Sequence, residues 1–200
     1  TDHLNTVSLI RGGPPLDDAG RGLHLHKRPY EILRHRFEDY PIDADIIIMD
    51  TPASLDPMGL IALAASTHLL VAIKPEFKDS SSSARLLEWF YAQLEELRLK
   101  PQPEILGFVP SRVNLNLADH RNLMGVDRKG NRNPDIDSTN TIPGQLEELG
   151  IPCFPMIRES GYFLSASGTG LPIHIYRPGD RVTKSFDPIA DKLIKLLKSR

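Results

Sequence analysis

The stretch DIIIMDTPAS, residues 45–54, carries the pattern on which the fold class depends. Its apolar part, Ile46–Met49, is a continuous aliphatic run, which is typical of a strand covered on both faces, as in a parallel sheet. Asp50 follows this run directly, so its carboxylate is expected at the carboxyl edge of the sheet, where open α/β folds bind ligands. The residues alone leave two roles open for Asp50: a ligand of Mg²⁺ that acts through water, and a cap of the next turn.

Strand and helix patterns alternate on both sides of this stretch. Leu69–Ile73 and Ile105–Val109 are further continuous apolar runs, and we expect them, with Ile46–Met49, to be the central strands. The alternation predicts an α/β fold, a mainly parallel sheet flanked by helices, in one domain over residues 1–200. Helices are predicted at residues 28–39, 60–65, 79–97, 143–149 and from Asp187 onward, and less regular strands at Leu4–Ile10 and Phe154–Ile157.

Composition limits the classes of function. The chain has 24 basic and 26 acidic residues, so any binding to nucleic acid must come from a local patch rather than from the global charge. No apolar run reaches the roughly 18 residues of a membrane span, and a span is not expected. The single cysteine, Cys153, excludes an internal disulfide. We therefore expect a cytoplasmic protein.

A polar insert interrupts the alternating pattern at about residues 114–140. A segment of this length inside a compact domain is usually functional or disordered, and the residues do not distinguish the two. Its centre, Asp127-Arg128-Lys129-Gly130-Asn131, is rich in turn-forming residues.

An ordered series of segments resembles the ParA/MinD family of P-loop ATPases (SIMIBI class). DIIIMDTPASLDPMGLIALAASTHLLVAIKPEF, residues 45–77, is similar to the second phosphate-sensing region of that family, in which Asp-Thr-Pro ends one strand and Pro-Glu follows the next. The strand ILGFV (105–109), the turn IRES (157–160) and the segment GLPI (170–173) follow in the family's order. Arg158 stands where the family has proline.

The resemblance implies an ATP- and Mg²⁺-dependent site. Asp50 would hold Mg²⁺ through water, and Thr51 and Pro52 would sense the γ-phosphate. The base of the nucleotide would lie beside two turns, formed by Ser111 and Arg112 and by Met156, Ile157 and Arg158. The family further implies a homodimer that encloses ATP, a ParB-like or other adaptor protein that stimulates hydrolysis, and association with the nucleoid in the positioning of a plasmid, chromosome or protein body.

The family's phosphate-binding loop, Lys-Gly-Gly-x-Gly-Lys-Thr, is not found in these residues. Arg11-Gly12-Gly13 is followed by no Gly-Lys-Ser/Thr and is interpreted as a turn. The resemblance implies that the first strand and the P-loop precede Thr1. A non-hydrolysing interaction module that keeps the fold without a P-loop is the alternative. One cysteine argues against nitrogenase-type iron proteins, and a biotin-pathway ligase matches the Pro-Glu and Gly-x-Pro segments less well.

The predicted last helix carries lysines at a regular spacing. Lys192, Lys195 and Lys198 recur every three residues, and Lys184 and Arg200 lie nearby. Such a strip can contact DNA phosphates without reading sequence. A solvated helix end, where cations are favoured, explains the same pattern. The C-terminal Lys198-Ser199-Arg200 lacks the bulky apolar residues of a MinD-like membrane helix.

Overall fold

The computed structural model describes residues 7–10, 22–51 and 57–199, and it divides the chain into two compact units, residues 1–66 and 67–200. Each unit is considered by itself. The assignment of residues 1–200 to one domain therefore stays a prediction.

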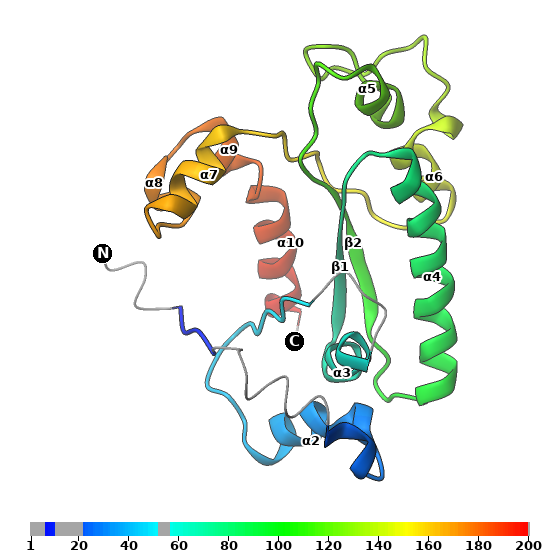
Figure 1. The fold of residues 1–200 in the computed structure, drawn as a ribbon, viewed down its shortest axis with the longest axis vertical. Coiled ribbons are helices and arrows are strands. Elements are labelled where there is room, and N and C mark those ends of the chain that lie inside the picture. The colour runs from blue at the N-terminus through cyan, green and yellow to red at the C-terminus, as the bar shows by residue number, and fades with distance from the viewer. Residues whose placement is uncertain (1–6, 11–21, 52–56, 200) are drawn as a thin grey trace. The chain divides into compact units, whose positions relative to one another are not determined.

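A parallel pair of strands forms the centre of the second unit (Figure 1). Strand β1, His68–Ile73, pairs with β2, Glu104–Pro110, in a register that runs from His68 opposite Glu104 to Ile73 opposite Pro110. Parallel neighbours require a crossover connection, and the helix α4, Phe77–Leu97, provides it. These two strands and α4 confirm the sequence prediction for this part of the α/β fold.

The core of this unit lies between the strand pair and its helices. Val71 of β1, Phe108 of β2 and Leu87 of α4 belong to one buried cluster, which also includes Leu146 of α6, Ile142–Glu148. Phe108 is 0% exposed. Burying a side chain of this size removes it from water at a gain of about 1.5–3 kcal/mol, so the cluster fixes α4 and α6 against the strands.

An irregular third strand lies beside β2. The backbone N–H of Phe108 donates to Pro152, and the N–H of Phe154 donates back to Phe108, each over 2.8 Å. Further along, Val113 pairs with Arg158 in a parallel bridge. Residues 152–159 thus run beside β2 as an irregular third strand held by isolated bridges, and the regular strand predicted at Phe154–Ile157 is not formed. Proline at positions 152 and 155 removes two N–H donors, which explains why the pairing stays irregular.

The polar insert is folded. It contains helix α5, Ala118–Met124, and a 3-10 turn, Ser138–Asn140, ahead of α6. Leu115 and Met124 pack with Val113 and Met156 in a second buried cluster. The insert is therefore anchored to the sheet by its own apolar residues.

Four helices follow the third strand. They are α7, Gly161–Gly168; α8, Ile173–Tyr176; α9, Arg181–Lys184; and α10, Asp187–Lys198. Helix α10 begins at Asp187 with Pro188 in its first turn, where a missing N–H costs no hydrogen bond. Phe186, not Asp187, is the capping residue.

The predicted strand Ile46–Met49 is wrong for this structure. Residues 46–49 have no regular secondary structure, and Ile48 is 82% exposed. A strand needs a hydrogen-bonded neighbour as well as apolar side chains, and in the described ranges the sheet pairs only β1 with β2. The predicted strand Leu4–Ile10 fails in the same way over residues 7–10, where Val7 is 70% exposed; residues 4–6 lie outside the described part.

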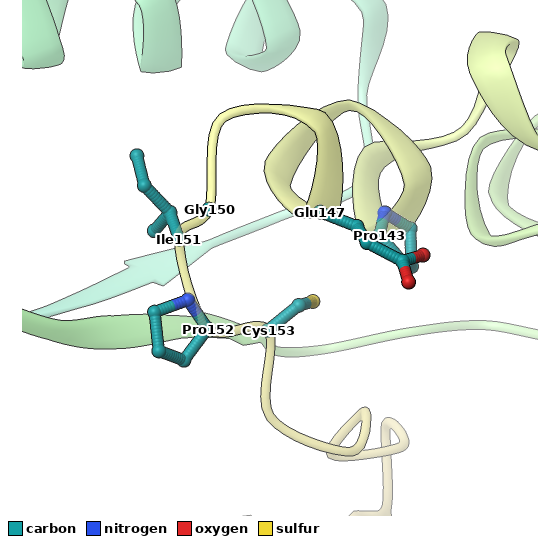
Figure 2. Close-up of a pocket in the computed structure, with 6 residues that line it drawn as sticks. All are labelled: Pro143, Glu147, Gly150, Ile151, Pro152 and Cys153. Atoms are coloured by element: carbon teal, nitrogen blue, oxygen red, sulfur yellow. The ribbon is translucent and has the colours of Figure 1, made fainter.

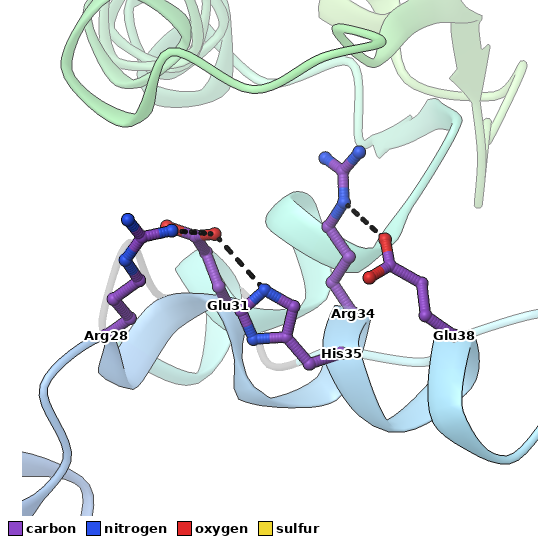
Figure 3. A network of polar contacts seen from close by, with 5 residues as sticks. All are labelled: Arg28, Glu31, Arg34, His35 and Glu38. Atoms are coloured by element: carbon purple, nitrogen blue, oxygen red, sulfur yellow. Dashed lines mark hydrogen bonds and ion pairs between the residues drawn. The ribbon is translucent and has the colours of Figure 1, made fainter.

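The regular secondary structure in the described part of the first unit is helical, while residues 7–10 and 40–51 form neither helix nor strand. The 3-10 turns Leu23–Leu25 and Pro29–Glu31 precede α2, Ile32–Asp39, and α3 covers Pro57–Ala65. Charged pairs connect the 3-10 turn Pro29–Glu31 and α2 (Figure 3): Glu31 contacts both Arg28 and His35 at 3.5 Å, and Arg34 contacts Glu38 at 3.3 Å. Exposed pairs of this kind contribute less than about 1 kcal/mol each, so they shape a solvated helix face rather than a site.

Candidate functional site

Ser111 lies where the two strands of the sheet end together. Its backbone N–H donates to the carbonyl of Ile73, the last residue of β1, over 2.7 Å, and its hydroxyl lies 3.4 Å from the same oxygen. Ser111 itself directly follows Pro110, the last residue of β2. This is the carboxyl edge of a parallel sheet, the place where open α/β folds bind ligands.

The two turns assigned to the nucleotide lie side by side at this edge. Ile157 donates its N–H to Pro110 over 2.8 Å, and Val113 donates its N–H to Ile157 over 3.1 Å. Between these bonds the chain passes through Arg112, whose φ of 54° lies in the left-handed region. A non-glycine residue there is uncommon and often marks a functional turn. The structure thus brings Ser111 and Arg112 next to Met156, Ile157 and Arg158; their roles stay predictions.

The side chain of Arg158 is held by the insert. Its guanidinium Nη2 donates to the carbonyl of Lys129 over 2.5 Å. Gly130, at φ +89°, lies directly against it: a Cβ at this position would fall 2.1 Å from Nη2. Partial burial lowers the pKa of Arg158, the positive charge of Arg181 lowers it further, and the carboxylate of Asp127 acts in the opposite direction. Sequence reasoning missed this contact, because a separation of 29 residues leaves no local pattern.

The turn that carries Gly130 is organised by Asp127. Its carboxylate accepts hydrogen bonds from the backbone N–H groups of Lys129 (2.8 Å) and Asn131 (2.9 Å), and the Asn131 side chain lies 3.4 Å away. Such Asx turns give the backbone a local alternative to helix or strand. The turn-forming residues at 127–131 could have indicated this geometry, but not that Arg158 contacts the turn.

We expect Asp127 to titrate below its ordinary range in the folded chain. The backbone N–H of Asn131 is the largest cause that lowers its pKa from 3.8, against a smaller opposing effect of burial. Because the folded pKa lies below the unfolded one, the contribution of this carboxylate to stability is present above pH 3.8 and is lost as pH falls through the folded pKa. An NMR titration of the Asp127 carboxyl carbon, with the urea-unfolded chain as reference, measures this. A midpoint equal to that of the unfolded chain would contradict the geometry of the turn.

A surface hollow of about 310 Å³ lies between the insert and the carboxyl edge of the sheet. Asn114, Arg128, Arg158 and Glu159 are among its lining residues. The Asn114 side chain donates to Glu159 over 3.0 Å, and the backbone N–H of Asn114 donates to Nδ1 of the buried His120 over 3.0 Å. We call this the insert hollow; its polar walls are positioned by bonds that link the insert to the third strand.

A second hollow, of about 400 Å³, lies beside α6 (Figure 2). Pro143 and Glu147 of α6 face the segment from Gly150 to Cys153 across it. Burial raises the pKa of the Cys153 thiol to about 11. The thiol therefore stays protonated near neutral pH, which favours a packing role for Cys153 over that of a nucleophile.

The three residues assigned to catalysis are only partly described, and their roles stay predictions. Asp50 and Thr51 are exposed in the first unit, outside helix and strand, and Pro52 lies outside the described residues. We expect Asp50 and Thr51 to face a cleft shared with Ser111; because these residues belong to separate units, this stays a prediction. The described ranges hold no group of three or more His, Cys, Asp or Glu side chains that could bind a metal. The exposed carboxylate of Asp50 suits Mg²⁺, which favours few protein ligands together with phosphate oxygens and water.

The lysine strip is exposed as expected. Lys192, Lys195 and Lys198 are exposed on α10, whereas Leu193, Leu196 and Leu197 are half-buried on its other side. Lys184 is exposed at the end of α9, and Arg200 lies outside the described residues. Over the described part of the chain, no helix is both long and apolar enough to cross a membrane.

Solved structures supply the comparison that fixes the fold. The structure resembles an ATP complex of McdA from Cyanothece (TM-score 0.67, 22% identity, over 90% of this chain and 63% of that one) and McdA from the same source without nucleotide (0.66, 22%, 90% and 65%). The chain has the fold of McdA. The same fold relates it to the cell division ATPase MinD of Pyrococcus furiosus (TM-score 0.55, 20% identity, 84% and 59%).

These comparisons agree with the ParA/MinD resemblance of the sequence. A cobyrinic acid a,c-diamide synthase from Mycobacterium smegmatis, solved with ADP and magnesium, is also similar (TM-score 0.52, 16% identity, 78% and 60%). No protein-family model and no curated protein matches the chain. The chain spans less than two thirds of each McdA structure, so part of the McdA fold has no counterpart here.

Proposed function

We propose that the chain is part of a ParA-like positioning ATPase. One observation carries the proposal: in a chain with the McdA fold, the Ser111–Arg112 turn and the Met156–Arg158 turn are hydrogen-bonded neighbours at the carboxyl edge of the parallel sheet. Ligands of open α/β folds bind at this edge. The McdA neighbour was solved with ATP, and the synthase neighbour with ADP and magnesium, which supports a nucleotide as the ligand.

Different residues of the chain would bind the base, the Mg²⁺ ion and the γ-phosphate. The carboxyl-edge turns flank the base, with the backbone of Met156, Ile157 and Arg158 on one side and Ser111 and Arg112 on the other. Asp50 would hold Mg²⁺ through water, and Thr51 and Pro52 would sense the γ-phosphate. Bound Mg²⁺ neutralises the charge that develops on the phosphate oxygens.

The cellular part of the proposal follows the family. ATP joins two subunits into a dimer, the dimer binds DNA without sequence preference through Lys184, Lys192, Lys195, Lys198 and Arg200, and a ParB-like adaptor stimulates hydrolysis and release. The protein would then act in the cytoplasm on the nucleoid. The exposed lysines of α10 support the DNA contact.

Nucleotide-dependent dimerisation tests the proposal. Light scattering of the complete protein should give twice the monomer mass with Mg²⁺ and a slowly hydrolysed ATP analogue, and the monomer mass with ADP. The ADP sample is the control, because it contains the same base and sugar. A monomer mass under both conditions, together with no binding of the analogue, would instead indicate a non-hydrolysing interaction module.

A further inference from the structure

The lining of the insert hollow carries a net positive charge, with two arginines and one glutamate among its residues. Arg128 and Arg158 line it, and the charge of Arg181, the first residue of α9, acts on Arg158. In the described part of the chain, none of these three arginines forms an ion pair with a carboxylate. Two guanidinium groups that line one hollow without an ion-pair partner favour the binding of an anion there.

The carboxylates nearby are already engaged in other bonds. Asp127 accepts the N–H groups of its own turn, and Asp180 accepts the backbone N–H of Val182 over 3.0 Å at the start of α9. Glu159 accepts from the side chain of Asn114. Each of these carboxylates thus accepts a hydrogen bond from a backbone or amide N–H group, and none of them forms an ion pair with Arg128 or Arg158 in the described part of the chain.

Arg158 is preorganised for binding. The carbonyl of Lys129 fixes one end of its guanidinium, and Gly130 permits this approach because it has no Cβ. A planar guanidinium whose orientation is fixed presents its remaining N–H groups in the fork geometry that matches phosphate oxygens. Arg128, which belongs to the turn that carries Lys129 and Gly130, adds a second guanidinium and is exposed to solvent.

We propose that the insert hollow, with Arg128 and Arg158, is a binding site for a phosphate group. The site differs from the proposed base site, which uses the backbone of Met156–Arg158, and it does not depend on ATP turnover. A phosphate of this kind can belong to a free nucleotide or to a nucleic-acid backbone. The hollow lies on the insert, so this surface gives the polar segment a function in addition to its packing on the sheet.

Matched arginine variants of the insert test the proposal. Arg128→Ser removes a charge from the hollow, whereas Arg132→Ser removes the same charge from an exposed position of the same insert that does not line it. The probes are inorganic phosphate and ADP, each followed by NMR titration, and a short DNA duplex of unrelated sequence, followed by fluorescence anisotropy. We expect Arg128→Ser to lower the affinity for the probe about tenfold, which is the loss typical of a charge-assisted hydrogen bond. Arg132→Ser should lower the affinity by less than about twofold.

Gly130→Ala tests the geometry without changing the charge. The new Cβ would displace the Arg158 guanidinium, so the affinity should fall although every arginine remains. Binding of phosphate or ADP with this pattern assigns the site to a free ligand, and binding of the duplex alone assigns it to a nucleic-acid backbone. Equal losses in Arg128→Ser and Arg132→Ser, or no binding of any of the three probes by the parent chain, would overturn the proposal. A parent that binds the duplex but is insensitive to Arg128→Ser overturns only this inference and leaves the α10 contact intact.

Discussion

Replacement of Asp50 by Ala in the complete protein should reduce ATP turnover by about three orders of magnitude. The carboxylate is expected to orient Mg²⁺, and single groups that stabilise the charge of a transferred phosphoryl group can contribute about 10³-fold or more to the rate. Asp50 is exposed and outside regular structure, so its loss should not unfold the chain. The measurement is steady-state release of phosphate at saturating ATP and Mg²⁺.

Asp45→Ala is the matched control for this experiment. Asp45 is an exposed aspartate on the same segment and precedes the aliphatic run instead of following it. It should turn over ATP at the parent rate. Both variants should still bind ATP, measured with a fluorescent analogue. Turnover at the parent rate by Asp50→Ala would refute the assignment of Asp50 to Mg²⁺ and leave it as a residue of the turn.

The sequence correctly predicted those strands whose hydrogen-bonded partner strand also lies in the described part of the chain. Leu69–Ile73 and Ile105–Val109 are aliphatic runs of the same kind as Ile46–Met49, and they pair with each other as β1 and β2. Ile46–Met49 has the same pattern but is exposed and unpaired. Aliphatic runs indicate that a strand is suited to burial, whereas hydrogen bonding needs a specific neighbour that periodicity does not identify. Amphipathic spacing, which needs no partner strand, predicted α4 and α10.

For the candidate site, the structure shows the position of the two turns but does not test the roles of their residues. Ser111 and Ile157 were assigned to one ligand through the family resemblance, and the backbone bonds now place the two turns together. The contact between Arg158 and the Lys129 carbonyl depends on how the insert folds back on the sheet. In the sequence, Gly130 within a turn-rich segment indicates a tight bend. It does not indicate which side chain occupies the space that a Cβ would fill.

The lysine strip of α10 should account for most of the DNA affinity of the ATP-bound protein. Lys192, Lys195 and Lys198 are exposed on the side of the helix opposite its half-buried leucines. Changing all three to Glu should remove detectable retardation of unrelated duplexes, because three attractions to phosphate become three repulsions. ATP binding should be unchanged, since these residues lie outside the carboxyl-edge turns. The measurement is electrophoretic mobility or anisotropy at matched salt, with ATP analogue present.

The neutral variant, with Gln at the same three positions, distinguishes a phosphate contact from a general charge effect. Each phosphate that the parent neutralises contributes roughly 0.9 to the slope of log affinity against log salt. If all three lysines contact DNA, the Gln variant should lose up to about 2.7 from that slope. Lysines that merely favour the negative end of the helix dipole would leave the slope unchanged and lower only helix stability, by about 0.3–1 kcal/mol each. An unchanged slope with parent affinity would therefore show that the strip is a solvated helix face, and the DNA contact would have to be sought on another surface.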